Sequence, residues 1–89
     1  MTTRELRVDE WIPFFNAFSR HYRGRLVSVR LADPRDPDHP QALAHRAPLV
    51  GLTTERESQT VTGIEVFVGD ADGGQVAHVV RNPTRVRVG

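Results

Sequence analysis

Three short segments near the C-terminus alternate apolar and polar residues, and this pattern limits the possible folds most strongly. They occupy residues 62–70, 75–82 and 84–88, and their apolar positions are Ile64, Val66, Val68, Val76, Val80, Val86 and Val88. Glycine-rich and proline-containing breaks, at residues 70–74 and 82–84, separate them. Alternation with a period of two between such breaks is typical of β-strands with one buried face. The sequence therefore predicts three consecutive strands.

Aromatic residues near the N-terminus follow a helical spacing instead. Five of the six aromatics of the chain lie in this stripe: Trp11, Phe14, Phe15, Phe18 and Tyr22. Acidic residues precede the stripe, Pro13 fits a first helical turn, and Gly24 fits a helix end. The pattern predicts an amphipathic helix over residues 9–23, with the stripe packed on a sheet. A stripe that stacks on bases or fills a partner's groove is the alternative interpretation.

Two more strands are expected between the helix and the C-terminal segments. They cover residues 25–32 and 47–55, and Gly51 in the second would let that strand bend sharply. Residues 33–46 contain three prolines and are expected to form a loop. We therefore expect one domain over residues 1–89, mostly β (α+β). Its N-terminal helix precedes a five-stranded, strongly bent antiparallel sheet or small barrel.

The composition excludes several classes of function. The chain has no cysteine, so it can form neither disulfides nor thiolate metal sites. His21, His39, His45 and His78 are not spaced as metal ligands, and the Asp70–Gly73 segment departs from a calcium-loop register. No arrangement typical of an enzyme is found, so we expect a non-enzymatic protein with no cofactor and no metal. Without an apolar leader or span, we expect no membrane association and a cytoplasmic location.

All twelve basic residues are arginine, although the net charge is only +1. Arginine binds phosphate with two parallel hydrogen bonds and stacks on bases, so such a surface would suit nucleic acid. Codon bias in a GC-rich genome is the favoured explanation of the same composition. The arginine content therefore leaves RNA as one candidate partner among others.

Two stretches resemble the Sm/Hfq-like small barrel, related to SH3-like barrels, in which five bent strands follow an N-terminal helix. Residues 49–53 are similar to the apolar-x-Gly-x-apolar centre of the first Sm motif, and residues 80–86 to the second motif. This resemblance implies ring assembly and single-stranded RNA binding, with Arg81 and Asn82 at matching positions. The chain also resembles, over nearly its whole length, a small bacterial domain family of unknown function.

Two functional hypotheses follow. In the first, the chain is an interaction or assembly module that binds itself or another protein through exposed strand edges and Phe67, an aromatic residue expected opposite the core face. In the second, it is an Sm-like RNA-binding protein that uses Arg81, Asn82, Arg85 and Arg87.

Overall fold

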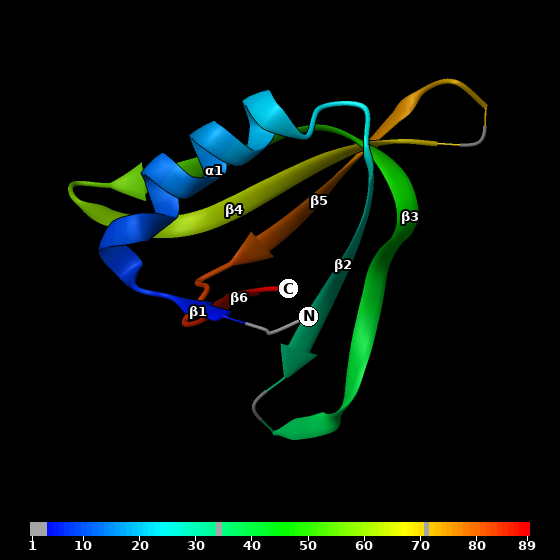
Figure 1. Ribbon diagram of the computed structural model, residues 1–89. Helices are drawn as coiled ribbons and strands as arrows, with labels where there is room; N and C mark the ends of the chain where they lie inside the picture. Colours follow the sequence, from blue (N-terminus) through cyan, green and yellow to red (C-terminus); the bar gives the residue numbers. More distant parts are fainter. Residues whose placement is uncertain (1–3, 34, 71) are drawn as a thin grey trace.

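A computed structural model describes residues 4–33, 35–70 and 72–89 (Figure 1). The elements in chain order are β1 (Arg4–Leu6), the 3-10 turn η1 (Val8–Glu10), α1 (Trp11–His21), β2 (Leu26–Asp33), β3 (Asp36–Glu57), β4 (Thr60–Gly69), β5 (Gln75–Arg81) and β6 (Val86–Val88). Residues 1–3, Pro34 of the expected proline-rich loop and Ala71 of the expected break at residues 70–74 lie outside the described residues. The expected class, mostly β with an N-terminal helix, is confirmed.

Strands β2 to β5 form one antiparallel sheet in sequence order, and this sheet curls into a half-barrel (Figure 1). One irregularity falls in the middle of β3, where the pairing with β4 shifts between Leu49 and Gly51. A shift of this kind bends the strand and increases its twist. The bend expected at Gly51 is therefore present, and it helps to curl the sheet.

The core lies between α1 and the concave side of the sheet. Ile64, Val66 and Val68 on β4 are buried, as their alternation predicts, and they pack with Trp11 and Phe15 of the helix. Trp11 is 2% exposed, and its indole N–H donates to the backbone oxygen of Leu6 at 3.4 Å. The aromatic stripe thus supplies the core, as expected, although not with all of its members.

The first and last strands pair with each other instead of joining the larger sheet. β1 and β6 form a separate antiparallel ladder, with Leu6 opposite Val86. Leu6 is buried in the core, so it anchors this small sheet to the rest of the molecule. Among the described residues, β2 and β5 consequently each have one edge without a strand neighbour.

The prediction of a loop over residues 33–46 was wrong, because β3 begins at Asp36 and its first half pairs with β2 in a hairpin. Its first half pairs only with β2, whereas pairing with β4 starts at Leu49. A strand segment with one neighbour tolerates proline, since only one side needs backbone donors. The residue before each proline is also held extended, which suits a strand as well as a loop.

A residue in the left-handed backbone region makes the junction after α1, and another makes the junction after β5. Gly24, with φ +85°, connects α1 to β2, and its N–H donates to the carbonyl oxygen of Leu49 at 2.8 Å. Asn82, with φ +52°, ends β5, and its N–H donates to the oxygen of Thr62 at 2.9 Å. Glycine and asparagine adopt this conformation at the least cost, so both predicted breaks follow from local sequence.

Candidate functional site

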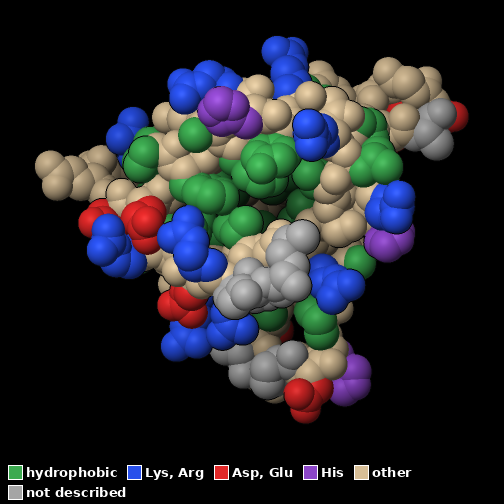
Figure 2. Space-filling model, in the orientation of Figure 1, with side chains coloured by type: hydrophobic (Ala, Val, Ile, Leu, Met, Phe, Trp, Pro, Cys, Tyr) green, Lys and Arg blue, Asp and Glu red, His purple; other side chains and the backbone are tan. Residues whose placement is uncertain are grey.

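The open side of the half-barrel contains a groove lined largely by apolar side chains. Its larger part has a volume of about 1460 Å³, and a smaller part of about 980 Å³ shares the residues Phe14, Phe18, Ser28, Val88 and Gly89 with it. Figure 2 shows this hollow as a patch of hydrophobic side chains, with basic side chains at several points around it. The two parts share lining residues, so we treat them as one groove.

Strands form the floor and two walls of the groove. Leu52, Ile64 and Val66 line it from β3 and β4. Residues 28–33 of β2 line one wall, and residues 86–88 of β6 line the groove as well. Because β6 pairs with β1 and not with β2, the space between these two strands stays open to the core.

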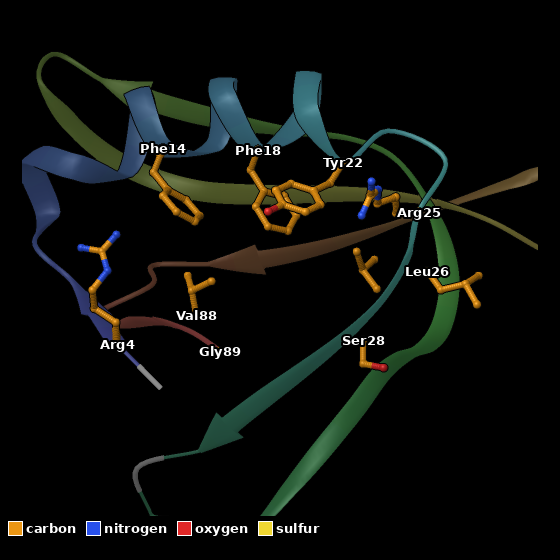
Figure 3. A pocket seen from close by; sticks show the side chains of 10 residues that line it. Arg4, Phe14, Phe18, Tyr22, Arg25, Leu26, Ser28, Val88 and Gly89 are labelled. Atoms are coloured by element: carbon orange, nitrogen blue, oxygen red, sulfur yellow. The ribbon is translucent and has the colours of Figure 1, made fainter. Parts of the chain in front are cut away.

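A ladder of three aromatic rings from α1 forms the remaining wall. The Phe14 and Phe18 rings stack with centroids 5.6 Å apart, and the Phe18 and Tyr22 rings stack with centroids 4.6 Å apart. The guanidinium of Arg4 lies 6.0 Å from the Phe14 centroid, and that of Arg25 lies 5.6 Å from the Tyr22 centroid. Figure 3 shows the rings side by side between these two arginines.

This stacking decides what the wall can bind. Aromatic faces attract cations and other rings, and here the faces are occupied by the neighbouring ring or by a guanidinium. The ring edges remain available, and they offer apolar surface to the groove. The wall therefore suits aliphatic side chains better than nucleobases.

Arginines surround the groove. The basic residues that line it are Arg4, Arg25, Arg30, Arg81, Arg85 and Arg87, and Asp33 is the one acidic residue among the described lining residues. Arg4 forms an ion pair with Glu10 at 3.4 Å, and Arg87 forms one with Glu5 at 3.7 Å. Within the described part of the chain the other four form no ion pair, so the rim carries a net positive charge.

The structure brings four of the five predicted site residues to one place. Arg81, Asn82, Arg85 and Arg87 all line the groove where β5 passes into β6. Phe67 lies apart from them, since it is cross-strand from Gly51 and Ala77 on the convex face of the sheet. It is half-buried there, so it contributes nothing to the groove.

Polar groups elsewhere have local structural roles. The Asp70 carboxylate accepts hydrogen bonds from the N–H groups of Asp72 and Gly74, at 3.0 and 2.8 Å, and so stabilises its own turn. His78 is half-buried opposite Val66. In the ranges that the structure describes, no three potential ligands gather to hold a metal ion.

One pair of carboxyl groups on the convex face is electrostatically coupled. A hydrogen bond with Glu55 raises the pKa of Glu65, and desolvation and the Glu55 charge act in the same direction, whereas Arg81 opposes them. Neither residue lines the groove, although Arg81, which interacts with Glu65, does. The pair therefore affects stability rather than the candidate site.

The groove itself could not be found from the sequence. The rim arginines Arg4, Arg25 and Arg30 come from segments that only the fold brings near Arg81 and Arg85. The width of the aromatic stripe was the one available signal. Trp11 and Phe15 are buried in the core. The sheet does not fully cover the other three aromatic side chains of the stripe, and Tyr22 remains 42% exposed.

Comparisons with other proteins give no relative from which a function could be transferred. No protein-family model matches the chain, and no curated protein and no solved structure matches it either. Within the described residues, α1 is too short and too polar to cross a membrane. The groove, with its apolar lining and arginine rim, is therefore the feature on which a functional proposal can rest.

Proposed function

We propose that this protein is an interaction module that binds a segment of another polypeptide in the groove of the half-barrel. The observation that carries the proposal is that the core of the domain is open between β2 and β6 and exposes apolar side chains there. Contiguous exposed apolar surface with a polar rim is typical of protein-binding sites. Filling the groove would also add to a core that is small for lack of chain length.

The dimensions favour a polypeptide over a small molecule. Small-molecule sites usually enclose roughly 300–1,000 Å³, and the larger part of this groove has about 1460 Å³. A peptide chain can fill an elongated space with successive side chains.

Single-stranded RNA is the second candidate ligand, because Arg81 and Arg85 lie together at the corner between β5 and β6 without an ion pair in the described structure. Such arginines could contact phosphates. A gel-shift titration at several salt concentrations tests this alternative with the double variant R81A/R85A. Salt-dependent binding that the double variant loses supports RNA, and binding that is absent at low salt, or unchanged in the variant, excludes it.

The peptide proposal is tested with a random peptide library selected on the full-length protein. A matched pair of variants locates the binding. Ala32→Trp fills the groove from β2, whereas Ala77→Trp places the same side chain on β5, outside the groove lining. Both positions are exposed, so neither substitution disturbs the core.

We expect selected peptides to bind Ala77→Trp within about twofold of wild type and Ala32→Trp roughly tenfold more weakly, a difference of about 1.4 kcal/mol. Isothermal titration calorimetry measures both. The proposal fails if no peptide is enriched, or if the enriched peptides bind Ala32→Trp as tightly as wild type.

A further inference from the structure

We infer that the segment bound in the groove is an extended, acidic strand of a different protein, which pairs with the free edge of β2 and fills the space between β2 and β6. This inference rests on the proposed function and specifies the conformation and charge of the ligand. Three features of the groove carry it, namely the backbone edge, the alternation of its environment and the charge of its rim.

Among the described residues, no strand pairs with the outer edge of β2. β2 forms its ladder with β3 on one side, and its residues 28–33 line the groove on the other. Backbone N–H and C=O groups along a strand edge are unsatisfied until water or another strand pairs with them. An extended peptide satisfies them by strand addition, a recurrent mode of peptide recognition.

The environment of an added strand would differ on its two faces. Successive side chains of a strand point in opposite directions. A strand beside β2 would direct one set toward Leu52, Ile64 and Val66, and the other toward the solvent at the rim, where Arg30 and Arg85 lie. Alternating apolar and acidic residues satisfy both environments.

The charge of the rim selects among the possible occupants. A second copy of this chain, docked groove to groove, would face the same arginines, and like charges at close range repel. Nucleobases would need exposed ring faces, and those of Phe14, Phe18 and Tyr22 are already stacked. Carboxylates, by contrast, would form ion pairs with Arg30 and Arg85, neither of which forms one with a described residue.

The test uses synthetic peptides of eight residues, the length of β2. One alternates Val and Glu, a second alternates Val and Lys, and a third has the Val-Glu sequence with a central proline. Two further versions carry N-methyl groups on every second residue, in the two possible phases, so that each lacks donors along one edge. Titration calorimetry with the wild-type protein gives the affinities, and NMR follows the amide protons of β2.

We expect the Val-Glu peptide to bind and the Val-Lys and proline peptides to bind at least roughly tenfold more weakly. At least one N-methylated phase should lose binding, because its free edge can no longer donate to β2. Amide protons of β2 should become protected from exchange in the complex. Binding of both N-methylated peptides as tight as that of the unmodified Val-Glu peptide, or no protection of β2, overturns strand pairing.

Charge is tested separately with Arg30→Glu and Arg85→Glu. Each should weaken binding of the Val-Glu peptide about fivefold, in the range of one exposed ion pair, and high salt should reduce the difference. Arg56→Glu is the matched control, since Arg56 is exposed and does not line the groove. Equal loss in all three variants would mean that only net charge matters, and it would overturn the assignment of the rim.

The outcomes separate this inference from the function on which it rests. Peptides from the random library that bind the groove but are neutral, basic or helical would overturn the acidic strand and leave the interaction module standing. A dimer in light scattering that Ala32→Trp disrupts would identify a second copy as the occupant and overturn the inference. Failure of every peptide, selected or designed, would remove both.

Discussion

Ser19 and Leu52, thirty-three positions apart, exchange two hydrogen bonds. The backbone N–H of Leu52 donates to the Ser19 hydroxyl at 2.9 Å, and that hydroxyl donates to the Leu52 carbonyl oxygen at 3.4 Å. Leu52 lies just beyond the irregular pairing at Gly51, on the floor of the groove. These two hydrogen bonds therefore hold α1, which carries the aromatic ladder, in a defined position relative to β3.

Replacing Ser19 by alanine should lower the free energy of unfolding by about 1–2 kcal/mol, because the part-buried Leu52 N–H loses its acceptor. Urea denaturation followed by tryptophan fluorescence measures this. Asn16→Ala, an exposed substitution on the same helix, is the control and should change stability little. Equal stability of both variants would show that water replaces the hydroxyl without cost.

Leu6 holds the small β1–β6 sheet to the core, being 3% exposed and in contact with the same cluster as Trp11. Leu6→Ala should cost about 2–5 kcal/mol, a large part of the stability of so small a domain. Val8→Ala, at a 62% exposed position, should cost far less. Thermal unfolding compares the two, and a Leu6→Ala protein as stable as Val8→Ala would contradict the placement of β1.

Arg46 adopts a left-handed conformation, with φ +47°, inside the β3 arm, and its N–H donates to the Ser28 hydroxyl at 3.0 Å. Glycine has no steric cost there, so Arg46→Gly should stabilise the protein by about 0.5–1 kcal/mol. Arg56→Gly, at a position on β3 without positive φ, should destabilise it by a similar amount. Chemical denaturation measures the stability of both variants. A loss of stability in Arg46→Gly as well as in Arg56→Gly would contradict the prediction.

Glu65 makes stability depend on pH. Its folded pKa is raised above the value of 4.5, first by the hydrogen bond with Glu55, so the folded state binds the proton more tightly than the unfolded state. This contribution is fully present below the unfolded pKa and is lost as pH rises through the folded pKa. Above that pH the wild type keeps two neighbouring carboxylates ionised.

Glu65→Gln removes this pH-dependent loss of stability, because the neutral amide of glutamine can donate a hydrogen bond to the Glu55 carboxylate at any pH. The difference in unfolding free energy between variant and wild type should therefore grow in favour of the variant as pH rises from below 4.5 toward neutrality. Urea titrations at a series of pH values measure it. A difference that stays constant over this range would show that the two carboxyl groups do not interact.

Local patterns were sufficient for most individual elements. Ile64, Val66 and Val68 are buried because alternation places them on one face of any strand with a single core side. Gly24 and Asn82 were recognisable as breaks because few residues accept positive φ. The proline-rich segment was misjudged because proline excludes a helix and a central strand but accepts an edge, and position in a sheet is not a local property.

What the sequence by itself determined is therefore the helix and most of the strands that follow it, in order and with the apolar face of each, but neither β1 nor the first half of β3. Only the tertiary structure decided that β6 pairs with β1 rather than with β2, that the barrel stays open, and that Arg30 and Arg85 border the same groove. The physical reason is the sequence distance over which each effect acts. Periodicity and backbone preference act over a few residues, whereas strand partners and the gaps between them depend on packing across the whole domain.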